Sequence, residues 1–156
     1  MEYNIRIVEF EQIDDALKLI WNTFLGFVAP DYSEEGIETF KTGFIENVDF
    51  KNKFKSEHEK MYGAYDNQKL VGVVSISVNN HISCVFVDKE FHRNGIATLL
   101  FNQVISDLKQ RQVKKMLLNA SPYAIQFYHS IGFKDLDEQQ EFHGILYTPM
   151  EYIIGE

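Results

Sequence analysis

At the start of the chain, hydrophobic and polar residues alternate first with the period of a strand and then with the period of a helix. Residues 3–9 alternate with period two, which is typical of a strand with one buried face. Residues 12–25 carry apolar side chains at helical spacing and predict an amphipathic helix packed on a sheet. Its apolar positions are Ile13, Ala16, Leu17, Ile20 and Phe24. After Pro30, Asp31 and Glu34 resemble a capping box that opens a second helix.

In the middle of the chain the residue pattern becomes that of strands. Residues 47–60 are crowded with charge and predict a solvated connection or a frayed helix. Strand-like runs follow at 61–65, 70–78 and 82–87, and the short links between them contain Asn and Asp. Because these residues tolerate the positive φ of tight hairpin turns, the three runs predict an antiparallel meander.

The second half of the chain mixes both periods. A long amphipathic helix is expected from Gly95 to near Arg111, and a second helix at 124–131, after Pro122 and before a stop at Gly132. Strands are expected at 115–119, 133–135 and 145–154. We therefore expect an α/β (α+β) fold with one mixed sheet flanked by helices, formed by residues 1–156 as a single domain. Residues 82–119 should form its right-handed parallel crossover.

Composition excludes several classes of protein. Hydrophobic residues make up 45% and charged residues 24%, which is ordinary for a globular protein. No apolar run has membrane-spanning length and the N-terminus does not resemble a signal peptide, so we expect a cytoplasmic protein. A net charge of -8 argues against nucleic acid and anionic membranes as partners and favours a cationic substrate.

Cysteine and histidine add little chemistry. The single cysteine, Cys84, lies in an apolar run and is expected to be buried rather than nucleophilic. The five histidines have no metal-ligand spacing, so no metal is predicted.

The junction between the apolar run and the long helix is the candidate for chemistry. It reads Val-Asp-Lys-Glu-Phe-His-Arg-Asn-Gly-Ile-Ala-Thr over 87–98. A helix start offers free N–H groups and a positive dipole end, Gly95 permits close backbone approach, and Arg93 can add a charge-assisted contact. A diphosphate fits such a site, although a purely steric role for the glycine is an equal reading. The spacing is that of neither a dinucleotide fold nor a P-loop.

Two motifs resemble the GNAT superfamily of acetyl-CoA-dependent N-acetyltransferases. The family motif has Gln or Arg, two residues, Gly, one residue, then Gly or Ala. Here His92, Gly95 and Ala97 stand at those positions, and Lys89 replaces the usual upstream Pro. A second stretch, residues 119–133, is similar to the family's downstream segment, with Ser121 in place of the usual Asn. The resemblance implies a mostly antiparallel sheet with a parallel pair of fourth and fifth strands.

The resemblance also implies an activity and a cofactor. It indicates transfer of the acetyl group of acetyl-CoA to a primary amine of a small molecule or peptide, by direct attack on the thioester. The pyrophosphate would lie on the N–H groups of 93–98, and the pantetheine arm would pair with 85–87. The implied cofactor-binding residues are Val85, Phe86, Val87, His92, Arg93, Asn94, Gly95, Ile96, Ala97, Thr98, Asn119 and Ser121. Asn119 and Ser121 have helix capping as an alternative role.

The catalytic and acceptor residues complete the expectation. Tyr128 is expected to protonate the departing thiolate, although a plain core role is the alternative. The proton acceptor for the amine stays open between Asp31, Glu34, Asp88 and a water relay. The loop between the first two helices is expected to line the acceptor site, or else to be a hydrophobic linker on the core. Its candidate substrate-binding residues are Phe24, Phe27, Asp31 and Tyr32.

Other functions share this pattern. The same fold can serve as a non-catalytic acyl-CoA-sensing or protein-binding module, or can transfer a longer acyl chain. The strand at 145–154 also offers an exposed edge for a possible homodimer.

Overall fold

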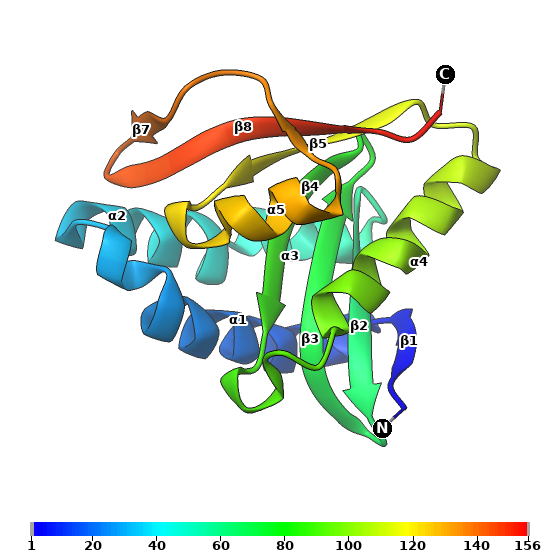
Figure 1. The fold of residues 1–156 in the computed structure, drawn as a ribbon. Helices are drawn as coiled ribbons and strands as arrows, with labels where there is room; N and C mark the ends of the chain where they lie inside the picture. The colour runs from blue at the N-terminus through cyan, green and yellow to red at the C-terminus, as the bar shows by residue number, and fades with distance from the viewer. Residues whose placement is uncertain (1, 156) are drawn as a thin grey trace.

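An open eight-stranded sheet runs through the computed structural model, which describes residues 2–155 (Figure 1). The strand order is β1-β2-β3-β4-β5-β8-β6, and β7 pairs with β8. Neighbouring strands are antiparallel except β4 and β5, which are parallel, as expected. The strands are β1 (Asn4–Ile7), β2 (Glu59–Asp66), β3 (Lys69–Ser77), β4 (His81–Val87), β5 (Lys115–Ala120), β6 (Lys134–Asp135), β7 (Gln140–Phe142) and β8 (Ile145–Ile153).

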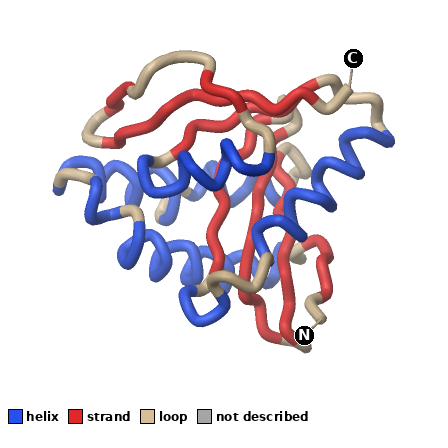
Figure 2. The backbone as a smooth tube through the Cα atoms, viewed as in Figure 1, coloured by secondary structure: helices blue, strands red, loops and turns tan. Residues whose placement is uncertain are grey.

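Helices cover both faces of the sheet (Figure 2). The α-helices are α1 (Ile13–Phe27), α2 (Glu34–Phe40), α3 (Val48–Lys55), α4 (Ile96–Gln110) and α5 (Ile125–Ile131). On one face, α1 and α3 bury Ile20 and Phe54 against Met61 and neighbouring sheet residues. On the other face, α4 and α5 pack around Phe101. None of the helices described within residues 2–155 combines the length and the apolar character that crossing a membrane requires.

The helix expected at 12–25 is confirmed, but two neighbouring predictions were wrong in detail. All five apolar positions of α1 are buried. The cap of α2 is Ser33, whose Oγ accepts from the Gly36 N–H at 3.1 Å. Asp31 does not cap it, because Asp31 belongs to the short turn Ala29–Asp31, whereas Ser33, with an extended backbone, stands immediately before the first residue of α2.

The charged stretch 47–60 is more regular than its composition indicates. Asn47 caps α3 by accepting from the Phe50 N–H at 3.0 Å, and the helix buries Phe54 in the core. The stretch then continues into β2, which begins at Glu59. Of the two alternatives, the solvated connection was wrong and the helix was closer, because one capping Asn and two phenylalanines dock a helix that is otherwise polar.

Strands β4 and β5 separate soon after they meet, and this divergence positions the site. Only His81 and Ile82 pair with β5, at Leu117 and Leu118. Along β3, Ile82 faces Ile76 and Cys84 faces Ser75, so Ser83 is an extra residue in a β-bulge. Because a bulge bends its strand, β4 turns away from β5 beyond Ser83. The edge of β4 from Ser83 to Val87 therefore faces β5 without pairing with it.

Candidate active site

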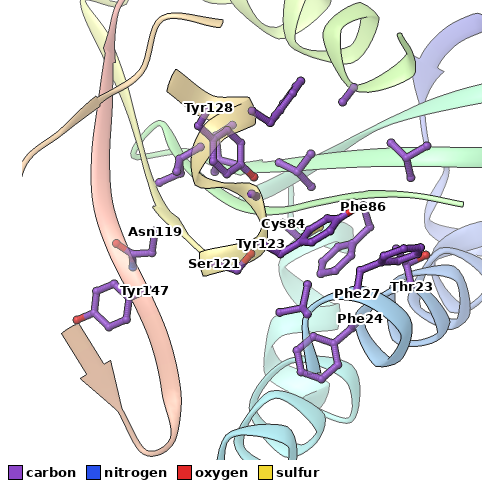
Figure 3. Close-up of a pocket in the computed structure, with 18 of the residues that line it drawn as sticks. Thr23, Phe24, Phe27, Cys84, Phe86, Asn119, Ser121, Tyr123, Tyr128 and Tyr147 are labelled. Carbon is purple, nitrogen blue, oxygen red and sulfur yellow. The ribbon is translucent and has the colours of Figure 1, made fainter. Parts of the chain in front are cut away.

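A cavity of about 1100 Å³ occupies the divergence between β4 and β5. Its lining comes from β4, the start of α4, the end of β5 and the start of α5, the region of α1 and α2, and the hairpin of β7 and β8. Figure 3 shows Tyr128, Cys84 and Phe86 in this space, with Asn119 and Tyr147 on its other side. Segments that lie far apart in the sequence therefore share one cavity.

The turn before α4 presents a run of unused backbone donors. Gly95 caps α4 with φ +75°, and Arg93 also has a positive φ of 67°. A Cβ at Gly95 would meet no atom within 4 Å, so the backbone conformation, not crowding, favours glycine here. Within residues 2–155, no backbone N–H from Arg93 to Thr98 donates a hydrogen bond. Such donors at the positive end of a helix form an anion site.

His92 braces this turn against the end of β4. Its Nε2 lies 2.7 Å from the Val87 carbonyl oxygen, and its ring centroid lies 4.6 Å from that of Phe27. Because a carbonyl oxygen only accepts, Nε2 carries the proton of this bond. The departure from the family motif at position 92 thus has a structural role of its own: it ties the turn to the strand.

The free edge of β4 offers backbone groups to an extended ligand. The Asp88 N–H donates to the Val71 carbonyl oxygen at 2.8 Å, which directs the backbone groups of Asp88 toward β3. Since successive residues of a strand alternate, Val87 and Val85 direct theirs toward the cavity. The Val87 carbonyl is already engaged by His92. The Val87 N–H and both groups of Val85 are thus the ones that point to the cavity.

Tyr128 on α5 lines the cavity from the face of the sheet that α4 and α5 cover, opposite the face covered by α1. Its ring packs edge-on against Phe101, Phe127 and Phe133, with centroids 5.5 to 6.0 Å apart. Its hydroxyl has no hydrogen-bond partner among residues 2–155, and the ring points toward the β4 side of the cavity in Figure 3. Burial, together with the nearby Cys84, raises the pKa of Tyr128 well above its usual value. The phenol therefore keeps its proton at neutral pH.

Cys84 is a neutral thiol beside this hydroxyl. It is buried, its Sγ lies 3.2 Å from Ser75 Oγ, and burial raises its pKa to about 12. A thiol in this state is a poor nucleophile, because the thiolate is the reactive form.

Glu59 is a buried carboxylate that the sequence reasoning missed. It is 4% exposed, and the Ser83 hydroxyl, which lines the cavity, donates to its Oε2. Burial raises the pKa of Glu59, and the bond from Ser83 and the charge of Lys53 oppose that rise. Period two could have revealed it, since Glu59 stands two residues before the buried Met61 and so shares its face.

Aromatic rings line the part of the cavity where the acceptor is expected. Phe24 and Phe40 stack 4.1 Å apart, and Phe40 continues to Phe44 at 5.1 Å and Phe86 at 6.1 Å. Tyr32 closes the cluster, and burial, with a smaller effect of the Asp31 charge, raises its pKa to about 12. Phe142, Ile145 and Tyr147 of the β7–β8 hairpin also line the cavity.

Most of the residues expected at the site line this cavity. They are Phe24, Phe27, Tyr32, Val85, Phe86, Val87, His92, Arg93, Gly95, Ile96, Ala97, Thr98, Asn119, Ser121 and Tyr128. Phe27 packs on His92 and Tyr123, on the side of the cavity where the turn before α4 lies. The Asn94 side chain instead donates to the Phe91 carbonyl oxygen at 3.1 Å.

The three acids expected as proton acceptors are not among the lining residues. Asp31 and Glu34 are exposed, and Asp31 is likewise absent from the acceptor wall. Asp88 caps the turn after β4 by accepting from the Glu90 N–H at 3.0 Å. Within residues 2–155, no three His, Cys, Asp or Glu side chains converge as metal ligands do.

Solved structures with this fold match almost the whole chain. The GCN5-related N-acetyltransferase structure from Rhodopseudomonas palustris has a TM-score of 0.84 and 18% identity, covering 98% of this chain and 96% of that one. The PaiA N-acetyltransferase of Thermoplasma acidophilum, solved in complex with coenzyme A, has a TM-score of 0.78 and 19% identity, covering 98% and 99%. At these identities the likeness shows the fold.

Sequence relatives match shorter shares of their own length. An uncharacterized N-acetyltransferase of Methanocaldococcus jannaschii is 27% identical over 146 residues, which cover 85% of this chain and 61% of that protein. An uncharacterized N-acetyltransferase of Pyropia yezoensis is 30% identical over 76 residues, covering 46% and 44%. The matched region thus spans about three fifths of the first relative and under half of the second. The model of the acetyltransferase (GNAT) domain matches residues 28–154, and this chain therefore belongs to the GNAT acetyltransferase family.

Proposed function

We propose that this protein transfers the acetyl group of acetyl-CoA to a primary amine by direct attack on the thioester. One observation carries the proposal: the unpaired edge of β4 leads directly to the free N–H groups of Arg93 to Thr98. A strand edge suits the two amides of a pantetheine arm, and a helix start suits a pyrophosphate. The coenzyme A complex of the Thermoplasma acidophilum structure supports the same cofactor class.

The cavity provides groups for each charge that develops in this reaction. The Val87 N–H points toward the divergence of the strands and can donate to the oxyanion of the tetrahedral intermediate, an aid worth about 3 kcal/mol in the barrier. The Tyr128 hydroxyl donates its proton to the departing thiolate sulfur. Cys84 is a neutral thiol and therefore a poor nucleophile, which favours direct attack of the amine over a route through an acetylated cysteine.

The attacking amine must lose a proton, and we assign its acceptor to Ser83 and Glu59. The Ser83 hydroxyl faces the cavity and already donates to the Glu59 carboxylate. As Ser83 Oγ takes a proton from the amine, its own proton passes to Glu59, so the pair receives one proton in total. The raised pKa of Glu59 makes it a stronger base than an exposed carboxylate. Glu59 does not itself line the cavity, so it acts through Ser83 as a positioning and relay residue.

Residues from both halves of the chain line this one cavity, from Thr23 on α1 to Tyr147 on β8. We therefore infer that residues 1–156 act as one domain.

The proposal is tested by mixing purified protein with acetyl-CoA and a panel of primary amines, and by measuring the release of free thiol. Release with at least one amine, together with an acetylated product of the right mass, supports the function. Calorimetry with CoA separates the rival function: tight CoA binding without turnover across the panel would indicate an acyl-CoA sensor. Propionyl-CoA and butyryl-CoA in the same assay measure the preference for acyl-chain length.

A further inference from the structure

The acceptor half of the cavity points to the chemistry of the amine. Resting on the function proposed above, we propose that the acceptor is a small primary amine that carries an aromatic ring and no second charge. A polyamine, an aminoglycoside and a peptide are then poor acceptors. Three features of the structure carry this inference: the aromatic wall, the absence of acids from it, and a contact that closes one side of the cavity.

The aromatic wall is a set of nearly parallel rings. Phe24 and Phe40 are inclined by 11° and Phe40 and Phe44 by 12°, while Phe86 from β4 approaches the same cluster at 57°. A flat ring from a ligand can extend such a stack or meet it edge-on, and either contact adds to the gain from burying apolar area. Phe86 lies on the β4 strand that we expect to hold the thioester, so a ring seated on the wall would hold its amine close to the acetyl group.

The lack of acidic side chains at the wall favours an amine with one charge over a polyamine. No aspartate, glutamate or lysine of residues 2–155 lines the cavity, and Arg93, the one permanently charged lining residue among them, belongs to the cofactor half. A monoamine loses its charge when it reacts and leaves no ion behind. A polyamine would keep at least one further ammonium, and an ion removed from water without a partner is costly. The net charge of -8 attracts cations to the surface in general, but it places no carboxylate where the acceptor binds.

A contact between α2 and the turn of the β7–β8 hairpin closes one side of the acceptor half. We call it the α2–hairpin bridge, formed by Gly36 and Thr39 of α2 with His143 and Gly144 of the turn. A Cβ on Gly36 would lie 2.2 Å from the Gly144 carbonyl oxygen, so two glycines allow the backbones to touch. Thr39 Oγ1 donates to the His143 carbonyl oxygen at 2.8 Å.

Figure 1 shows α2 beneath the β7–β8 end of the sheet, where this bridge lies. Thr39 also lines the cavity, and so do Phe142 and Ile145, which flank the turn. A polypeptide could not cross the cavity between α2 and the turn without breaking the bridge. This geometry favours a small acceptor that is enclosed over an extended peptide that lies in an open groove.

Binding can be tested apart from turnover, because the only tryptophan in the sequence lies behind the wall. Trp21 stacks on Phe24 at 5.7 Å and on Phe40 at 6.5 Å. In the presence of CoA, 2-phenylethylamine should change the fluorescence of Trp21 in a saturable way, whereas spermidine and tetra-alanine should not. A response to spermidine or tetra-alanine, or none to 2-phenylethylamine, would overturn the inference.

Turnover then separates this inference from the function on which it rests. We expect kcat/KM for 2-phenylethylamine to exceed those for spermidine and tetra-alanine at least tenfold. If spermidine or the peptide is acetylated better, acetyl transfer stands and the acceptor class is wrong. If 2-phenylethylamine binds but no amine is acetylated, the wall is assigned correctly and the proposed function fails.

A gain of charge gives a second, independent test. Thr23 lines the cavity from α1, and Thr23→Glu adds the carboxylate that the wall lacks. Relative to the isosteric Thr23→Gln, it should shift the ratio of kcat/KM for 1,4-diaminobutane over 2-phenylethylamine at least tenfold toward the diamine. Asn22→Glu adds the same charge at an exposed neighbour outside the cavity and should leave the ratio unchanged. Equal ratios in folded Thr23→Glu and Thr23→Gln proteins would contradict the inference.

Discussion

Replacing Tyr128 by phenylalanine removes one hydroxyl from the cavity and little else. The ring contacts with Phe101, Phe127 and Phe133 persist, and no partner among the described residues loses a hydrogen bond. The midpoint of thermal unfolding, Tm, should therefore stay unchanged or rise. A change in rate without a loss of stability would then report the chemistry of the hydroxyl.

The size of the rate effect follows from the environment of the phenol. A positioned acid contributes about 10² to 10⁴ in rate. Burial raises the pKa of Tyr128 above the ordinary value of about 10, whereas a thiol titrates near about 8.5, so complete proton transfer from the phenol to the thiolate is energetically uphill. We therefore expect the lower end of the range, a loss of about a hundredfold in kcat, or about 2.7 kcal/mol in the barrier.

The assay is thiol release from acetyl-CoA at saturating amine, measured from pH 6 to 10. Because its pKa is raised, Tyr128 stays protonated over this range, so activity of the natural sequence should rise with the free-amine fraction without a falling limb. Tyr152→Phe is the matched control, since that ring packs on Phe133 but does not line the cavity. A loss below about tenfold at every pH, where a working acid contributes a hundredfold or more, would refute the general-acid role.

Three further substitutions probe other parts of the site. Because burial raises the pKa of Glu59, its ionisation costs stability as pH rises through that raised pKa. Glu59→Gln should therefore keep or raise Tm at pH 8. The same substitution should lower kcat/KM at neutral pH, and kcat/KM should recover at higher pH, where the amine is already deprotonated. An unchanged pH–rate profile would contradict the relay. His92→Ala removes one hydrogen bond worth about 1 kcal/mol and should weaken acetyl-CoA binding about fivefold by calorimetry, with Ser106→Ala on the exposed side of α4 as the unaffected control. Equal affinity in both would show that the brace is dispensable. Gly95→Ala forces a φ of +75° on a residue that resists it by about 1–2 kcal/mol and should weaken acetyl-CoA binding, whereas Gly26→Ala, which also has room for a Cβ but no positive φ, should raise Tm. Equal effects of the two on CoA affinity would argue against the cradle.

Local patterns predicted most of the elements and the cofactor half of the site. The stripe of α1, the meander of β2 to β4 and the glycine-opened α4 all follow from spacing and turn residues within a few positions of each other. The predictions were wrong where a single residue has more effect on local structure than the composition around it. Ser33 rather than Asp31 caps α2, and Asn47 anchors a helix in a stretch that is otherwise charged.

The resemblance in two motifs pointed to Tyr128 and the turn at 93–98, which do lie at the cavity, but the hydrogen bond of His92 could be seen only in the structure. Its bond to the Val87 carbonyl joins two residues whose relation depends on how the chain turns after β4. The acids named from loop position were not brought to the cavity, because a position near a strand end does not determine which way a side chain points.

The sequence by itself determined the repeating features: which faces are apolar, where glycine opens α4, and that aromatic residues gather before α2. Only the tertiary structure decided what these features meet. The bulge at Ser83 brings its hydroxyl to Glu59, 24 positions away, and Gly36 touches Gly144 at one side of the cavity. The physical reason is range: hydrophobic period and turn chemistry act between near neighbours, whereas register, strand divergence and backbone contacts arise only when distant segments pack.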